Sequence, residues 1–128
     1  MIFIDSDFII DYLRGDENTI KIINNLKEDI ATTEVNVFEI MYGLHIKQSI
    51  NQDQIDSAKE FFNTLTIFPF NSNCGEKSAK ILTKLIKEGK EIEQNDCFIA
   101  SIILENRFNK ILTNNKKHFE RIEEIKLI

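Results

Sequence analysis

The sequence contains few of the residues that mark flexible or modular chains. Its 128 residues include one proline and four glycines, which argues against a flexible linker or a low-complexity segment. No apolar stretch approaches the roughly 20 residues that a membrane-spanning helix needs, and the N-terminus lacks the basic region and cleavage site of a secretory signal. A chain of this length is expected to form a single domain, residues 1–128, that buries about two thirds of its unfolded surface.

Cysteine and positive charge are also scarce. The two cysteines, Cys74 and Cys97, lack the spacing of metal ligands and are expected to be buried thiols in a reducing cytoplasm. The 16 Lys and Arg residues are outnumbered by 21 Asp and Glu residues, which gives a formal net charge of −5. This balance argues against passive binding of nucleic acid through a broadly basic surface. It does not exclude an enzyme that binds phosphate groups through cations held by its own acidic side chains.

The sequence does contain short apolar runs that alternate with amphipathic segments. Strands are expected at residues 2–4, 29–32, 65–70, 110–113 and 125–128. Helices are expected at residues 8–13, 18–27, 34–46, 52–64, 72–88, 95–105 and 115–121. Strands that alternate with helices predict an α/β fold in which a parallel sheet is covered on both faces.

The expected order of the strands follows from one proline and from this pattern. Pro69 cannot donate a hydrogen bond to a sheet ladder, so the third strand is expected at an edge. The order 3-2-1-4-5, counted along the chain, satisfies this and places the first strand beside the fourth. Ligands of open α/β sheets bind where the direction of winding reverses, beyond the carboxyl ends of the strands. Asp5 follows the first strand and Asn115 follows the fourth, so both are expected in that crevice.

Asp5 is the most informative residue, because a buried strand delivers its carboxylate to the strand's carboxyl end. Glu39, in the helix after the second strand, and Asp96, in the first turn of the helix before the fourth, are candidates to join it. If these carboxylates converge to about 5 Å, each ionised pair repels by about 3 kcal/mol at an effective dielectric constant of roughly 20. Such a cluster either holds protons at raised pKa or binds a cation, and oxygen ligands suit Mg²⁺ or Mn²⁺. A divalent ion there would acidify a water molecule and offset charge on a phosphodiester.

Each of these acids also has a simpler interpretation. Asp5 and Asp96 occupy positions where helix caps are common, and Asn95 is another candidate cap. Glu39 has the position of a residue on a solvated helix face. Their combination at one predicted crevice is a stronger signal than any of them alone.

Four segments resemble, in order, the motifs of the PIN-domain ribonucleases, in particular the VapC-type toxins of prokaryotic toxin–antitoxin pairs. The segments are Ile2–Gly15, Thr33–Gly43, Asn95–Ser101 and Thr113–Phe119. Each is short, but their order and spacing cover nearly the whole chain and are specific together. The resemblance implies a three-layer α/β/α PIN-like fold, a Mg²⁺- or Mn²⁺-dependent endoribonuclease, a homodimer, and inhibition by a cognate antitoxin.

The resemblance also implies which residues act. Asp5, Glu39 and Asp96 are expected to bind the metal ion, and Asn115 is expected to assist as an uncharged amide where many relatives have an acid. His118 stands where an acid often precedes the phenylalanine, and it is interpreted as a partly exposed histidine rather than an RNA contact.

Other side chains near the predicted crevice are open to two interpretations. Arg14, Lys116 and Lys117, with Arg121, are candidate contacts to an RNA backbone, although a charge run is equally typical of a solvated face. Asp7 is close enough to Asp5 to tune the site, and the alternative is an acid in the first helical turn that favours the helix dipole. Tyr42 and Gly43 are candidates for a subunit contact, with ordinary packing as the alternative.

Two other classes of enzyme or signalling domain are alternatives to the ribonuclease. Asp5 and Asp7 after a strand resemble the aspartate-nucleophile phosphatases, but Ile9 stands where those enzymes have threonine or valine. Receiver domains need an aspartate after the third strand, where this chain has Phe70 and Asn71. The remaining alternative is a non-catalytic PIN-like module that only binds its partner or RNA.

Overall fold

The computed structural model describes all residues, 1–128, as five strands and seven helices. The strands are β1 (Ile2–Ile4), β2 (Ile30–Thr33), β3 (Thr66–Phe68), β4 (Lys110–Leu112) and β5 (Lys126–Leu127). The helices are α1 (Ser6–Leu13), α2 (Glu17–Asn24), α3 (Glu34–His45), α4 (Gln52–Phe62), α5 (Ser72–Lys87), α6 (Gln94–Glu105) and α7 (Lys116–Phe119). Every predicted element is present, and only the ends differ. The third strand is shorter than predicted, because Pro69 has no N–H with which to continue the ladder.

The five strands form one parallel sheet in the predicted order, β3-β2-β1-β4-β5. The strand that precedes Pro69 therefore lies at an edge. β1 is central: Ile2 pairs with Ile30 of β2, and Ile4 pairs with Leu112 of β4. Because β1 and β4 are parallel neighbours, the residues that follow them leave the sheet at the same edge.

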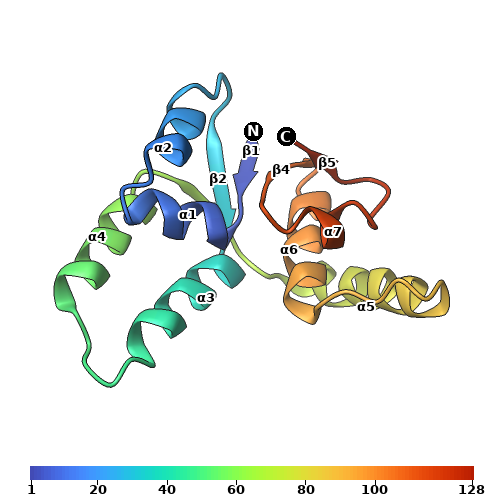
Figure 1. Cartoon of the computed structure of the whole chain (residues 1–128). Helices are drawn as coiled ribbons and strands as arrows, with labels where there is room; N and C mark the ends of the chain where they lie inside the picture. The colour runs from blue at the N-terminus through green and yellow to red at the C-terminus, as the bar shows by residue number, and fades with distance from the viewer.

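Successive residues of β1 face opposite layers of helices, as the two-residue repeat of a strand requires. Phe3 packs in a core cluster with residues of α5, α6 and α7, whereas Ile2 and Ile4 pack in a second cluster with residues of α1 to α4. Figure 1 shows α1 to α4 on one side of the sheet and α5 to α7 on the other. The fold is therefore the three-layer α/β/α arrangement that the sequence predicts.

Both cysteines lie in the interior, as predicted. Cys74 and Cys97 are free thiols with no exposed surface. Burial, followed by the charge on Asp96, raises the pKa of the Cys97 thiol to about 11, so this residue stays protonated and serves packing. None of the seven helices is long and apolar enough to cross a membrane.

Candidate active site

Asp5 lies directly between the end of β1 and the start of α1, where its carboxylate is buried. It is the N-cap of α1, and its Oδ1 accepts hydrogen bonds from the backbone N–H of Ser6 and from Nδ2 of Asn36, both at 2.9 Å. Its Oδ2 accepts a bond from Oγ1 of Thr113, just after β4, at 2.7 Å. The cap expected at this position is thus present, and the same carboxylate joins α1 to α3 and to the end of β4.

Glu39 is connected to Asp5 through two polar residues. The side chain of Asn36, in the capping box that Thr33 forms at the start of α3, donates to Oγ of Ser6 at 3.0 Å as well as to Asp5. Ser6 Oγ in turn donates to Oε1 of Glu39 at 2.8 Å. The interpretation of Glu39 as a residue of a solvated face is therefore wrong: its side chain is half-buried and directed to the residue that follows Asp5.

Asp96 is buried in the first turn of α6 but does not cap it. The N-cap is Glu93, which makes no side-chain capping bond, so the cap interpretation is wrong for both Asp96 and Asn95. Oδ2 of Asp96 accepts a hydrogen bond from Nδ2 of Asn115 at 2.9 Å and lies 2.5 Å from Nδ1 of His118. His118 is partly exposed, as predicted, and the sequence interpretation did not include its contact with Asp96.

The four predicted site residues are thus linked at one edge of the sheet. The backbone N–H of Asn115 donates to Thr113 Oγ1 at 2.9 Å, which closes the connection between Asp5 and Asp96. The result is a continuous chain of hydrogen bonds through Glu39, Ser6, Asn36, Asp5, Thr113, Asn115, Asp96 and His118. We refer to these eight residues as the polar chain.

Burial and mutual repulsion raise the pKa values of three acids at this edge. Burial, and to a smaller extent the charge on Asp5, raises the pKa of Asp7 to about 6. The same two influences raise the pKa of Glu39 and of Asp96, against the opposing hydrogen bonds from Ser6 and His118. Because the Asp5 charge acts on all three, these carboxyl groups lie within electrostatic reach of one another.

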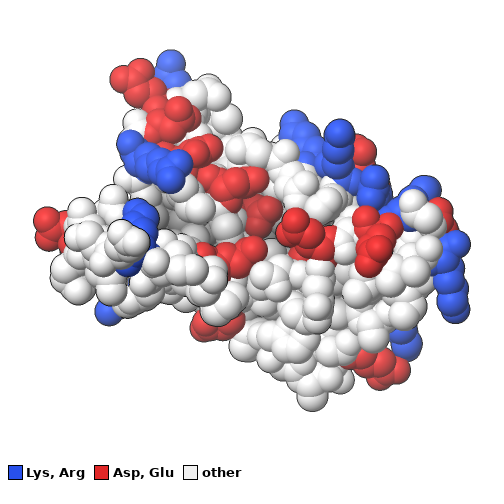
Figure 2. Space-filling model, turned by 60° about the horizontal axis from the view of Figure 1, so that its bottom comes forward, with Lys and Arg blue, Asp and Glu red and all other residues white.

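Acidic side chains dominate this part of the surface. β1 runs toward the bottom of Figure 1, so Figure 2, which brings that side forward, looks toward the carboxyl ends of the strands. Asp and Glu side chains gather across the middle of this face, and Lys and Arg side chains lie toward its borders. Such a distribution suits a cation at the centre and an anionic ligand held from the sides.

The donor atoms at this edge are of the chemical type that hard divalent cations prefer. The structure does not bring three carboxylate, imidazole or thiol groups close enough to hold one ion. The available ligands are nevertheless carboxylate and amide oxygens, which Mg²⁺ and Mn²⁺ prefer. Oδ1 of Asp96 accepts no hydrogen bond. Because the structure has no buried side-chain nitrogen or oxygen that lacks a hydrogen-bond partner, this oxygen is accessible and open to a ligand. A cation would also relieve the repulsion between Asp5, Glu39 and Asp96.

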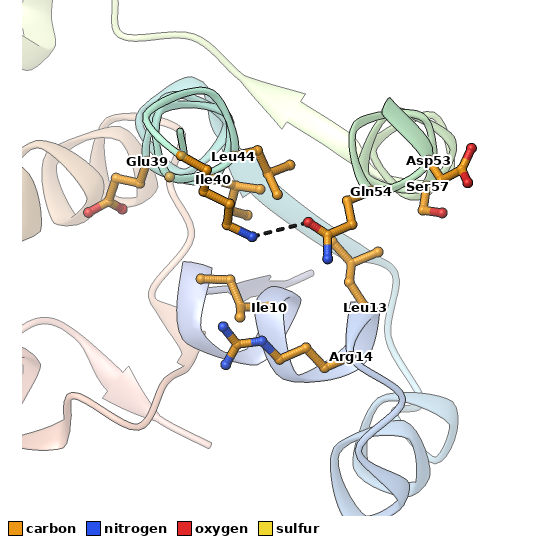
Figure 3. A pocket seen from close by; sticks show the side chains of 11 residues that line it. Ile10, Leu13, Arg14, Glu39, Ile40, Leu44, Asp53, Gln54 and Ser57 are labelled. Carbon is orange, nitrogen blue, oxygen red and sulfur yellow. Dashed lines mark hydrogen bonds between the residues drawn. The ribbon is translucent and has the colours of Figure 1, made fainter. Parts of the chain in front are cut away.

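The predicted RNA contacts lie on both sides of the polar chain. Lys116 and Lys117 are exposed on α7, directly after Asn115. Arg14 lines a cavity of about 300 Å³ between α1, α3 and α4, which Glu39 also lines (Figure 3). Arg121 instead donates to the backbone carbonyl of Glu91 at 2.9 Å.

Several residues of the site escaped the sequence interpretation. Asn36 stands three residues after Thr33, which is capping-box spacing and a usable signal. Thr113 ends the predicted fourth strand, but nothing local indicates its bond to Asp5. For Asp7 the sequence allows a role near the site as well as one toward the helix dipole, but it does not indicate that the carboxylate accepts the backbone N–H of Asn114 at 2.9 Å and holds the segment after β4.

Comparison with known proteins identifies the family and the fold of the chain. A model of the PIN domain family matches residues 2–125. No curated protein sequence matches the chain.

Solved structures of toxin–antitoxin complexes share the fold. VapBC2 from Rickettsia felis, bound to a DNA fragment from its promoter, matches with a TM-score of 0.87 and 23% identity over 100% of this chain and 98% of that one. DNA-bound VapBC from Salmonella typhimurium matches with a TM-score of 0.86 and 18% identity, over 99% of this chain and 96% of that one. VapBC-1 from nontypeable Haemophilus influenzae matches with a TM-score of 0.81 and 22% identity, over 100% of this chain and 97% of that one. With the family match over nearly its whole length, the chain belongs to the PIN domain family.

Proposed function

We propose that this protein is a metal-dependent endoribonuclease of the VapC type, a toxin that a cognate antitoxin inhibits. The observation that carries the proposal is the polar chain, which connects Asp5, Glu39, Asp96 and Asn115 at the carboxyl edge of the sheet. Membership of the PIN domain family and the likeness to toxin–antitoxin complexes support it.

Asp5, Glu39 and Asp96 hold a Mg²⁺ or Mn²⁺ ion in this proposal, and Asn115 assists. When bound, such an ion acidifies water and offsets the charge on a phosphodiester in transit. Asp5 is held by three hydrogen bonds and needs little reorganisation to act as a ligand. Glu39 and Asp96, whose pKa values are raised, gain most from a nearby cation because positive charge favours their ionised forms.

The basic residues on either side are proposed to hold the RNA backbone. Lys116 and Lys117 lie next to Asn115, and Arg14 lies on the side of Glu39. Because the chain carries a net charge of −5, contact with phosphate depends on these local cations and on the metal ion rather than on the whole surface.

The proposed partners are the antitoxin and a second copy of the chain. The structures that this fold matches are complexes of toxins with antitoxins. For the homodimer, α3 and the residue that caps its carboxyl end offer an apolar row of Phe38, Tyr42 and Ile46, which are 60%, 55% and 62% exposed. Exposed apolar rows of this kind mark contacts with another protein. The free, buried cysteines fit the reducing cytoplasm, which is the proposed location.

The substitution Asp5→Asn tests the metal-dependent activity. Its Oδ1 still accepts from Ser6 and Asn36, and its new amide can donate to the Thr113 hydroxyl, so the fold is expected to remain. Cleavage of total RNA in the presence of Mn²⁺ is expected to fall by about a hundredfold or more, as when one electrostatic group is removed from an active site. EDTA is expected to abolish the activity of the unchanged protein.

Asp11→Asn is the matched control, because Asp11 lies on the same helix but outside the polar chain. It should cleave RNA like the unchanged protein. Full activity of Asp5→Asn, or cleavage that persists in EDTA, would refute the assignment. A protein that neither cleaves RNA nor binds Mn²⁺ in calorimetry, yet binds RNA, would instead be the non-catalytic module.

A further inference from the structure

His118 is held firmly against Asp96 by the way α7 is anchored. The side chain of its neighbour Phe119 has no exposed surface and belongs to the core cluster beneath α5 and α6. His118 itself is partly exposed, and its Nδ1 lies 2.5 Å from Oδ2 of Asp96. The imidazole is therefore placed by the core and not by a mobile surface segment.

Two donors converge on one oxygen of Asp96. Asn115 and His118 are three residues apart, the spacing that puts side chains on one face of a helical turn. Nδ2 of Asn115 lies 2.9 Å from Oδ2 of Asp96 and 2.9 Å from Nδ1 of His118, so the three atoms form a compact triangle. An ionised Asp96 carboxylate only accepts, so in that state the imidazole donates its Nδ1–H to Oδ2. The 2.9 Å contact between Nδ2 of Asn115 and Nδ1 of His118 is then not a hydrogen bond, and both nitrogens donate to the carboxylate. This arrangement occupies Oδ2 and leaves Oδ1 available.

We infer that His118 is a positioning residue: its Nδ1–H fixes Oδ2 of Asp96, so that Oδ1 is presented to the divalent cation. This inference rests on the proposed function, because it gives a role to His118 only if Asp96 is a ligand. A histidine stands here at a position where the resemblance leads us to expect an acid. A carboxylate there would repel Asp96, whereas the imidazole donates to it.

The experiment measures Mn²⁺ affinity by calorimetry in three variants. His118→Ala removes the donor, and because Asn115 still holds the same oxygen, affinity is expected to fall about tenfold, the lower end of the usual effect of a residue that supports a metal ligand. His118→Asn places an amide N–H near the position of Nδ1 and is expected to restore affinity to within about threefold. His118→Gln, whose amide reaches the position of Nε2 instead, is expected to behave like His118→Ala.

The control is His45→Ala, because His45 is the other histidine and lies exposed at the end of α3. It should bind Mn²⁺ like the unchanged protein. Circular dichroism and the thermal midpoint establish that each variant is folded. Equal affinity of His118→Ala and the unchanged protein, or failure of the asparagine to restore affinity, overturns the role of His118 alone. If the unchanged protein binds no Mn²⁺, the proposed function falls together with this inference.

Discussion

At the scale of single residues, Asn36 has the most demanding environment in the site. Its amide is 1% exposed, donates to Asp5 and Ser6, and accepts from the hydroxyl of Thr33 at 2.7 Å. A buried hydrogen-bonding group that loses its partner costs about 1–3 kcal/mol, and here several partners share one side chain.

Asn36→Ala is therefore expected to lower the free energy of unfolding by about 2–4 kcal/mol, measured by urea denaturation. Asn51→Ala is the matched control, because Asn51 also accepts a capping bond, from the N–H of Gln54, but on an exposed helix end. The loss of this capping bond is expected to lower the free energy of unfolding by about 1 kcal/mol. Equal losses in the two variants would show that the buried partners of Asn36 add nothing.

At the scale of elements, the central strands are tied together at their amino ends by Glu28. This carboxylate, just before β2, accepts hydrogen bonds from Lys110 of β4 and, at 2.8 Å, from the amino group of Met1 before β1. The bond from Lys110, followed by that from the amino group, lowers the pKa of Glu28 to about 2. The contact is exposed to solvent, so its effect on stability is small.

The pH dependence of this contact has a definite sign. A carboxyl group with a lowered pKa in the folded state stabilises that state above its ordinary value of 4.5, and this contribution is lost as the pH falls toward about 2. Glu28→Gln is therefore expected to have a lower thermal midpoint than the unchanged protein at pH 7. The difference should shrink progressively below pH 4.5.

Lys110→Met provides the control for this pair. If the two side chains stabilise the fold through their mutual contact, the thermal midpoint of the double variant Glu28→Gln, Lys110→Met at pH 7 should fall by less than the sum of the decreases in the two single variants. If the thermal midpoints of Glu28→Gln and the unchanged protein differ by the same amount from pH 7 to pH 3, the contact is excluded as the cause of that difference.

At the scale of the whole molecule, the apolar row on α3 predicts the state of association. Phe38 and Tyr42 stack with their ring centroids 5.7 Å apart, and with Ile46 they extend along the exposed side of the helix. Tyr42→Glu places a charge in the centre of this row. It is expected to convert a homodimer into a folded monomer, since burying an unpaired carboxylate is costly.

Light scattering coupled to size-exclusion chromatography measures the mass of each species. Ile86→Glu is the matched control, because Ile86 is an exposed apolar residue, 49% accessible, on α5 and outside the row. This variant should remain a dimer. A monomeric unchanged protein, or a dimeric Tyr42→Glu, would contradict the assignment of the row.

Much of the fold could be predicted because it depends on local patterns. Short apolar runs form the buried strands, and Gly15 and Gly89, with φ of 81° and 70°, end α1 and α5 as expected. Pro69 placed the third strand at an edge for a local reason, the lack of an N–H. The strand order followed from these features, and the order alone brought Asp5 and Asn115 to one edge.

The sequence by itself thus determined the layers, the strand order and the identity of the acids that reach the carboxyl edge. Only the tertiary structure decided how they are held. Thr113 bonds to Asp5 across 108 positions of sequence, and Asn36 does so across 31. Hydroxyl and amide side chains have no hydrophobic periodicity that would reveal such partners. Their partners follow from the packing of helices against the sheet, which places His118 on Asp96 and Ser6 between Asp5 and Glu39.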